Sequence, residues 1–278
     1  MEPADYQSAV ELANTMNWHM TTEDFAFNAT LEPNGCFALR EGKELVGVAT
    51  CINYGDVGWF GNLVVKEAYR QKGAGSALVN YAVNYLKGAG VKTVGLYAYP
   101  HLKAFYGKMG FQADVEFVVL KAASVSAGSM EVAEEKCVRE MWTQDLSQVS
   151  AFDAGCFGGC RKKLLELILQ NPNNTGYVAF DRGEVAGYVT AKVFGDTAEV
   201  GPLACQRSHP ADAAGLLGAV LRGLEGKEAF MYLPASELEL LQVARDAGFR
   251  EEFGLVRMFL GSVTLQHCLY TAESLERG

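Results

Sequence analysis

The sequence predicts an α/β fold of the α+β kind, in which one arrangement of strands and helices occurs twice in tandem. Three observations support this prediction. The chain has 278 residues, which corresponds to two domains at roughly 150 residues each. The same order of strands and helices precedes and follows the stretch at 122–129. Each half also closes its last helix with a glycine-phenylalanine pair, a helix end followed by a core residue.

The first copy of the arrangement starts with two strands joined by a turn at Glu41-Gly42-Lys43. An apolar strand follows, and then a helix whose apolar residues recur at helical spacing. The predicted elements, in chain order, are strands at Cys36–Leu39, Glu44–Asn53 and Gly61–Val65, a helix with its apolar face at Leu78, Ala82 and Tyr85, a strand at Thr93–Tyr97, a helix that ends at Met109-Gly110-Phe111, and a final strand.

The second copy repeats this order, with a turn at Asp181-Arg182-Gly183. Its apolar strand begins at Gly201, 140 positions after Gly61. The predicted elements are strands at Gly176–Phe180, Glu184–Val193 and Gly201–Cys205, a helix with its apolar face at Leu216, Val220 and Leu224, a strand at Ala229–Leu233, a helix that ends at Ala247-Gly248-Phe249, and a final strand.

The residues between the copies, 122–129, are small and polar and show no apolar periodicity, so they predict a linker. The sequence therefore predicts one domain at 1–123 and another at 130–278. We refer to these as the first copy and the second copy.

Composition restricts the function classes. The net charge is −9, and phosphate backbones repel an acidic chain, so we expect no nucleic-acid partner. No apolar run reaches the roughly 18–20 residues of a membrane helix, so we expect no membrane partner. The acidic start lacks the apolar core of a secretory signal, and we expect a cytoplasmic protein.

The seven cysteines are scattered along the chain, and the closest pair, Cys156 and Cys160, does not have the C-x₂-C spacing of a zinc ribbon. There are only four histidines and no H-E-x-x-H motif, so we expect no metal. We expect reduced thiols, with Cys156 and Cys160 as small buried hydrophobic residues.

The two copies differ at a glycine-rich turn that the first copy contains. Between the third strand and the helix of the first copy, Arg70–Gly75 has the pattern R-x-x-G-x-G. Small residues let a ligand approach the backbone, and N–H groups at a helix start point in one direction. Such a turn can hold phosphate or pyrophosphate, and Arg70 or Lys72 can add charge.

Other phosphate-binding loops fit this turn less well. A dinucleotide fingerprint needs a third glycine where this chain has Leu78, and a Walker A loop needs a G-K-[ST] sequence that does not occur. The six residues alone leave open a glycine turn without any ligand.

With its surroundings, the turn resembles that of the GCN5-related N-acetyltransferases, or GNAT family. The resemblance covers about Thr22 to Val119 and includes Gly58–Val65, the turn, Leu96–Tyr99 and Ala104–Phe111. The whole chain is similar to a two-domain subgroup whose second acetyltransferase domain is degenerate, through Phe157–Leu165 and Gly201-Pro202-Leu203. The resemblance implies tandem GNAT folds, each a mixed, mostly antiparallel sheet flanked by helices.

The resemblance also implies acetyl-CoA as the co-substrate. In the family, the strand before the turn pairs through its backbone with the pantetheine arm, and an N–H near Val65 polarises the thioester carbonyl. Tyr106 matches the family's general acid, which protonates the leaving thiolate. The implied acetyl-CoA site consists of Leu63, Val64, Val65, Arg70, Gln71, Lys72, Gly73, Ala74, Gly75 and Ser76.

The second copy lacks these features. Pro210 stands at the position of Arg70, and proline has no N–H to donate. Ala213 stands at the position of Gly73 and Ala244 at that of Tyr106. We therefore expect one cofactor site, in the first copy, and expect the second copy to complete the acceptor site.

The acceptor site is less well indicated. An amine acceptor must lose a proton, and four residues are candidates for the base: Glu23, Asp24, Asp56 and His101. Candidates to line the pocket are Trp18, Trp59, Asn62 and Tyr97 in the first copy, with charges from Asp153 and Arg161 in the second. Each of these residues is equally compatible with packing, a helix cap or a surface ion pair.

The expected reaction moves the acetyl group of acetyl-CoA to the amine of a small molecule, by direct attack in a ternary complex. Three alternatives stay open: a protein N-terminus or lysine as the acceptor, a longer acyl group, and a CoA-responsive binding module without turnover.

Overall fold

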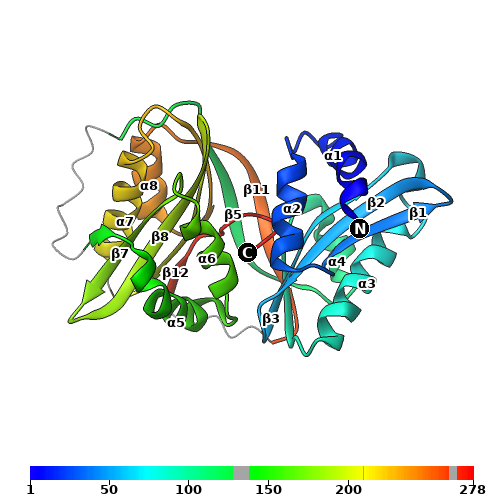
Figure 1. The fold of residues 1–278 in the computed structure, drawn as a ribbon, viewed down its shortest axis with the longest axis horizontal. Coiled ribbons are helices and arrows are strands. Elements are labelled where there is room, and N and C mark those ends of the chain that lie inside the picture. Colours follow the sequence, from blue (N-terminus) through cyan, green and yellow to red (C-terminus); the bar gives the residue numbers. More distant parts are fainter. Residues whose placement is uncertain (128–137, 209, 263–267) are drawn as a thin grey trace. The chain divides into compact units, whose positions relative to one another are not determined.

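The computed structural model describes residues 1–127, 138–208, 210–262 and 268–278 (Figure 1). The chain forms two compact units, one of Met1–Leu96 with Arg277 and one of Tyr97–Glu276 with Gly278. These are the first unit and the second unit below. Among the described residues, no helix has both the length and the apolar character needed to cross a membrane.

The first unit is built on a sheet in the order β1-β2-β3-β4. β1, β2 and β3 are antiparallel neighbours, and β4 runs parallel to β3. The elements are α1 (Tyr6–Asn14), α2 (Thr22–Leu31), β1 (Cys36–Glu41), β2 (Glu44–Asn53), β3 (Val57–Val65), α3 (Ala74–Gly88) and β4 (Thr93–Ala98), whose last two residues belong to the second unit.

Helices cover both faces of this sheet (Figure 1). Leu12 of α1 and Phe25 of α2 share a buried cluster with Val48 of β2. On the other face, α3 lies against Gly47, where an added Cβ would be 3.0 Å from Leu78. Glycine at this position thus lets α3 approach the strands closely, which fixes the start of α3 next to the end of β3.

The sheet of the second unit has the order β11-β5-β10-β9-β8-β7-β6, and β12 pairs with β9. The elements are α4 (Lys103–Gly107), β5 (Gln112–Ala122), β6 (Val138–Glu140), α5 (Leu146–Phe157), α6 (Lys162–Gln170), β7 (Thr175–Asp181), β8 (Glu184–Phe194), β9 (Thr197–Gln206), α7 (Pro210–Arg222), β10 (Glu228–Pro234), α8 (Leu238–Asp246), β11 (Arg250–Leu260) and β12 (Cys268–Tyr270).

In the second unit, the two faces of the sheet pack on different helices, as the alternation of side chains along a strand requires. Val189 and Leu203 belong to the cluster that contains α7 and α8. Their neighbours Tyr188 and Ala204 belong to the cluster that contains α5 and α6. The strands are consequently buried on both sides.

The final strand of the first copy is part of the second unit. β5 lies between β10 and β11 and pairs antiparallel with both. The compact units therefore divide the chain at a different place from the sequence copies, because the units follow contacts and the copies follow the repeated order of elements. The division into 1–123 and 130–278 stays a prediction.

The predicted strands and helices agree with the structure in type and order, and the fold class is confirmed as a mixed, mostly antiparallel sheet flanked by helices. Of the elements named above for the described chain, six lie outside the predicted set: α1, α2, α5, α6, β6 and β12.

The predicted linker lies partly in the interior: of its described residues, 122–127, only Ala123, Ser124 and Ser126 are exposed. Val125 and Ala127 are buried. The Val125 N–H donates to the Lys227 carbonyl (2.8 Å), and the Ser126 N–H donates to the Ala247 carbonyl (3.0 Å). Backbone hydrogen bonds and small buried side chains hold this stretch, although its composition is typical of a linker. Residues 128 and 129 lie outside the described residues.

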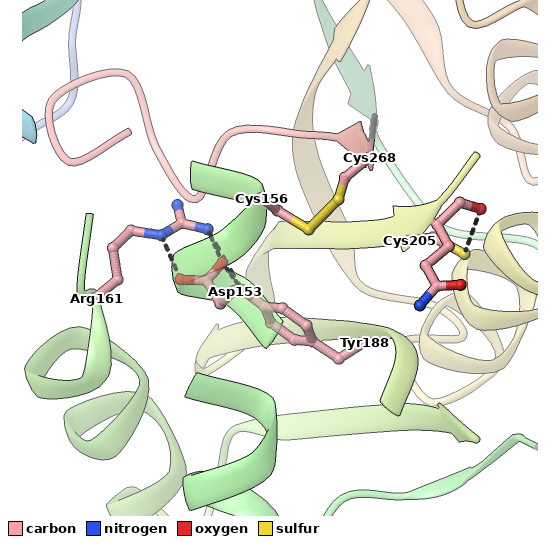
Figure 2. The surroundings of a disulfide bond; sticks show 7 residues. Asp153, Cys156, Arg161, Tyr188, Cys205 and Cys268 are labelled. Carbon is pink, nitrogen blue, oxygen red and sulfur yellow. Dashed lines mark hydrogen bonds and ion pairs between the residues drawn. A yellow bond between two sulfur atoms is a disulfide. The ribbon is translucent and has the colours of Figure 1, made fainter. Parts of the chain in front are cut away.

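The expectation of reduced thiols is wrong at one pair. Cys156 of α5 and Cys268 of β12 form a disulfide, which Figure 2 shows. The two cysteines are 112 residues apart, so sequence spacing gave no indication of the bond. Cys160, expected to be buried, is exposed, whereas Cys36, Cys51 and Cys205 are buried.

Candidate functional site

The centre of the candidate site is an irregularity in β3. In the pairing with β2, Val64 lies opposite Val48 and Gly61 lies opposite Thr50, so β3 carries one extra residue in between. Asn62 sits in this bulge with a left-handed backbone (φ 51°), which asparagine tolerates better than most residues. The Asn62 Nδ2 is buried and has no hydrogen-bond partner among the described residues.

The second feature is the edge of β3 that faces away from β2. β4 pairs with this edge only along Val57–Trp59. No strand in the described part of the chain pairs with the rest of the edge. The Lys66 N–H donates to the Val46 carbonyl of β2 (2.9 Å). Because N–H direction alternates along a strand, the Val65 N–H points to the unpaired edge.

The third feature is the turn between β3 and α3. Gln71 (φ 59°) and Gly73 (φ 90°) both have left-handed backbones. Gly73 caps α3 without any side-chain hydrogen bond, and the first turn of α3 contains no acidic residue. The first amide N–H groups of a helix have no partner inside the helix, and left-handed residues near them form a concave anion site. The turn therefore offers several donors to an anion.

The surroundings of the turn keep it accessible. The structure exposes Arg70, Gln71, Lys72 and Gly73 and leaves Ala74, Gly75 and Ser76 partly exposed. A Cβ added to Gly73 would meet nothing within 4 Å. The Arg70 Nε donates to the Val65 carbonyl (2.9 Å), which fixes this cation beside the end of β3.

These three features fit the diphosphate and amide-containing arm of coenzyme A. Donor groups and a cation are available for the diphosphate, without a carboxylate in the first helical turn. The unpaired edge of β3 at Leu63–Val65 has the backbone groups that an amide-containing arm needs.

Tyr106, the predicted general acid, lies in α4 of the second unit. Its side chain is 5% exposed and packs edge-on against Phe105 and Phe111. Burial raises the pKa of the Tyr106 phenol, so the hydroxyl keeps its proton well above neutral pH.

Tyr97, a predicted pocket residue, lies in the second unit among charged groups. Burial raises the pKa of Tyr97 to about 12, although the nearby positive charges of Arg257 and Arg161 oppose this shift. Arg257 forms an ion pair with Asp114 (2.7 Å) and lies over the Phe117 ring. The Tyr97 phenol is therefore neutral at physiological pH.

The other predicted pocket residues lie in the first unit. Trp59 is 1% exposed and belongs to the core. Trp18 is half-buried and packs against the cluster formed by α1, α2 and β2. Of these residues, only Asn62 presents a buried polar group without a partner in the described chain.

Two of the four candidate bases have structural roles. Asp24 accepts a hydrogen bond from the Thr21 N–H (2.8 Å), as part of the capping box of α2. Asp56 forms an exposed ion pair with Lys92 (3.0 Å). A backbone hydrogen bond lowers the pKa of the exposed Glu23 carboxyl, which makes it a weaker base. His101 is exposed and stacks on Tyr99.

Asp153 and Arg161, the two charges proposed from the second copy, are fully buried and paired with each other (Figure 2). The Arg161 Nε donates to Asp153 Oδ2 (3.0 Å), and the Tyr188 hydroxyl donates to Asp153 Oδ1 (2.6 Å). The Arg161 guanidinium also donates to the Gly278 carbonyl (2.6 Å). The structure thus places both charges inside the second unit.

The corresponding turn of the second copy differs from that of the first. α7 begins at Pro210, and Asp212 lies in its first turn. Proline removes an N–H donor, and a carboxylate near a helix start disfavours an approaching phosphate. Asp212 therefore makes the start of α7 less favourable for an anion. The sequence shows this acidic residue, but the prediction did not use it. Among the described residues, no group of three or more His, Cys, Asp or Glu side chains could hold a metal.

Comparisons with known proteins address both halves. Residues 6–111 match the model described as the acetyltransferase (GNAT) family, and residues 149–268 match the model described as the acetyltransferase (GNAT) domain. The search of curated proteins gave no match.

Solved structures share the fold of the whole chain. A putative acetyltransferase from Pyrococcus horikoshii is 20% identical, with a TM-score of 0.80, over 100% of this chain and 94% of that one. A GCN5-related N-acetyltransferase from Sphaerobacter thermophilus is 14% identical, with a TM-score of 0.64 and 93% of each chain covered. A tandem GNAT protein from the clavulanic acid biosynthesis pathway is 16% identical, with a TM-score of 0.62, over 94% of this chain and 95% of that one. At these identities the likeness concerns the fold.

Proposed function

Because both halves of this chain belong to the GNAT acetyltransferase family, we propose that it is an acetyl-CoA-dependent N-acetyltransferase with its co-substrate site in the first copy. One observation carries the proposal. In the first copy, an edge of β3 that no described strand pairs with leads directly into a turn whose helix has neither a side-chain cap nor an acidic residue in its first turn.

Acetyl-CoA supplies the activated acetyl thioester, and the residues of the first copy hold it. The amides of Gly73, Ala74, Gly75 and Ser76 bind the diphosphate, with charge from Arg70 and Lys72. Leu63 contributes backbone groups to the arm, whereas the backbone groups of Val64 face β2 by the same alternation. The Val65 N–H stabilises negative charge on the carbonyl oxygen, a contribution of about 3–4 kcal/mol in comparable sites.

Tyr106 gives its proton to the leaving thiolate. A buried phenol stays protonated through the working pH range, which an acid in this role requires. The second copy has Ala244 at the corresponding position, so this step belongs to the first copy alone.

The acceptor is a small-molecule amine. Asn62 is the contact best supported by the structure, because its amide nitrogen is a buried donor without a partner among the described residues. An alkyl amine with a pKa of about 10.4 is neutral in only about one molecule in 2,500 at pH 7, so its proton must leave before attack. Water is the proposed carrier of that proton, since Asp24 and Asp56 are engaged in a cap and an ion pair.

A screen of amine acceptors with acetyl-CoA, read out as free CoA, tests this function. The library should contain small amines, peptides with free N-termini and lysine peptides, and each should be run with the Tyr106→Phe variant as a control. We expect release with a subset of small amines, greatly reduced in the variant. Release with peptides alone would replace the proposed substrate class. Tight acetyl-CoA binding without release for any acceptor would favour a CoA-responsive binding module.

A further inference from the structure

In the second copy, the strand that corresponds to β3 is covered by a later part of the same chain. β12 pairs antiparallel with β9, with Cys268 opposite Gln206 and Tyr270 opposite Ala204. The next residue continues this contact: the Thr271 N–H donates to the Leu203 carbonyl (2.8 Å), and the Leu203 N–H donates to the Thr271 hydroxyl (2.8 Å). We call residues 268–274 the closing segment.

The closing segment also reaches β10. β9 and β10 pair only along Thr197–Val200, opposite Glu228–Met231. Beyond this point the Ala272 N–H of the closing segment donates to the Tyr232 carbonyl of β10 (3.3 Å). The segment thus enters where the two parallel strands stop pairing. The first copy has the same interruption, since the pairing of β3 with β4 ends at Trp59.

Glycine makes room for the segment. A Cβ added to Gly201 would lie 2.0 Å from the Ala272 carbonyl oxygen, a distance no side chain can occupy. Gly201 also has a φ of 152°, a conformation that residues with side chains rarely adopt. The backbone of β9 is therefore shaped to receive another backbone at this point.

Buried contacts anchor both ends of the segment. At one end, Cys268 is joined to Cys156 (Figure 2). At the other, Glu273 is fully buried and forms an ion pair with Lys192, which also pairs with Glu199 (2.6 Å). Thr271, Ala272 and Ser274 are buried as well. The segment is thus part of the interior of the second unit.

The position of the segment gives it a functional meaning. Leu203, Ala204 and Cys205 stand 140 positions after Leu63, Val64 and Val65, the stretch of β3 along which the coenzyme arm lies in the proposed function. We propose that the closing segment is a built-in ligand of the second copy, and that its strand takes the place of the pantetheine arm. This inference rests on the proposed function, because it assigns to β9 the counterpart of the β3 role.

The physical basis is a match of backbone chemistry. A pantetheine arm and a peptide strand both present amide N–H and carbonyl groups, so one strand edge can accept either of them. The segment is covalently attached, so its effective concentration is in the millimolar range and coenzyme cannot readily displace it. One site per chain, that of the first copy, is thereby left for acetyl-CoA.

Hydrogen exchange of the full-length protein, with and without saturating acetyl-CoA, tests this inference. We expect acetyl-CoA to slow exchange in 60–66 and 70–76, and to leave 201–206 slow and unchanged. Equilibrium dialysis should give one acetyl-CoA per chain. Additional protection of 201–206 on binding, or two acetyl-CoA per chain, would overturn the inference while leaving the proposed function intact.

A matched pair of variants tests whether the closing segment is bonded to β9, and this test does not depend on acetyl-CoA binding. Thr271→Val removes the hydroxyl that accepts from the Leu203 N–H, and we expect that amide to exchange about tenfold faster. Thr190→Val removes another buried hydroxyl that bonds the same strand, at the Gly201 carbonyl (2.7 Å), but leaves the segment in place. Equal effects of the two variants on Leu203 would show that the segment does not hold this strand. Absence of acetyl-CoA binding in every variant would instead remove the proposed function.

Discussion

The two copies contain the same central strand, β3 or β9, and a helix after it. They differ in what pairs with the edge of that strand that faces away from β2 or β8. In the first copy the edge of β3 is unpaired beyond Trp59 among the described residues, and it leads to a turn capped by Gly73. In the second copy β12 and Thr271 cover the edge of β9, and the following helix starts with Pro210 and Asp212.

The comparison separates what the fold requires from what the chemistry requires. Gly47 and Gly187 occupy corresponding positions, and at each an added Cβ would lie close to the helix that covers the strands, at Leu78 or Leu216. Close packing of helix on sheet is therefore kept in both copies. The donors and the open edge are kept only in the first, which is why the co-substrate is assigned there.

The largest effect is expected from breaking the turn of the first copy. Gly73→Val places a branched side chain at a φ of 90°, which costs about 1–3 kcal/mol and rotates the amides of the turn. We expect acetyl-CoA affinity to fall by about 100-fold or more, because the diphosphate loses several donors together. Calorimetric titration measures this loss.

Gly90→Val is the matched control for this change. Gly90 also has a φ of 90°, an added Cβ would meet nothing within 4 Å, and it follows the other end of α3. The backbone penalty is thus comparable, and affinity should stay within about threefold of the unchanged protein. Equal losses in both variants would mean that strain, and not the turn, determines binding.

The next largest effect is expected at Tyr106, the predicted general acid, which is Ala244 in the second copy. Tyr106→Phe keeps the buried ring and removes the hydroxyl, so kcat should fall by about 10–10³-fold with acetyl-CoA affinity nearly unchanged. Because burial raises the pKa of Tyr106, activity should not decline through loss of this proton between neutral and mildly alkaline pH. Steady-state kinetics across this range checks both statements, with the exposed Tyr81→Phe as a control. Unchanged turnover would remove Tyr106 from the acid role.

A third change should affect stability in the second copy and leave co-substrate binding in the first copy intact. Asp153→Asn leaves the fully buried Arg161 without its charged partner, at a cost of about 3–5 kcal/mol. The exposed pair of Asp56 with Lys92 gives the contrast, since Asp56→Asn should cost about 1 kcal/mol or less. Denaturant unfolding measures both. A loss of acetyl-CoA affinity in folded Asp153→Asn would show that the pair is more than structural.

The smallest effect concerns the cysteines. Burial raises the pKa of Cys36 to about 11, so only about one thiol in a thousand is ionised at pH 8. Among the described cysteines, exposed Cys160 should be alkylated first, Cys36 slowly, and Cys156 and Cys268 only after reduction. Mass spectrometry of the alkylated protein gives this order. Rapid alkylation of Cys268 without a reductant would argue against the disulfide and against one anchor of the closing segment.

The sequence was most informative where local patterns determine structure. Alternating apolar residues and glycine turns gave the strands around Gly42 and Gly183, and the offset of 140 gave the repeat. The resemblance to the GNAT family was confirmed in both halves. The glycine pattern predicted a turn directly before a helix, and in the structure Gly73 caps α3.

These local patterns could not predict contacts between residues that are far apart in the sequence. Cys156 and Cys268 give no sign of their pairing, and 122–127 looks like a linker because its residues are small. The strand of the closing segment, Cys268–Tyr270, is too short to be predicted from a pattern of alternation. Its position depends on the edge of β9 that β10 does not pair with. The Asn62 Nδ2, which has no hydrogen-bond partner among the described residues, lies in a bulge that only the strand register reveals.

The most direct test of the central claim is a crystal structure of the protein grown with acetyl-CoA. We expect the diphosphate on the amides of 73–76 and the arm along Leu63–Val65, with the closing segment still on β9. A diphosphate bound elsewhere while that turn stays empty would contradict this claim.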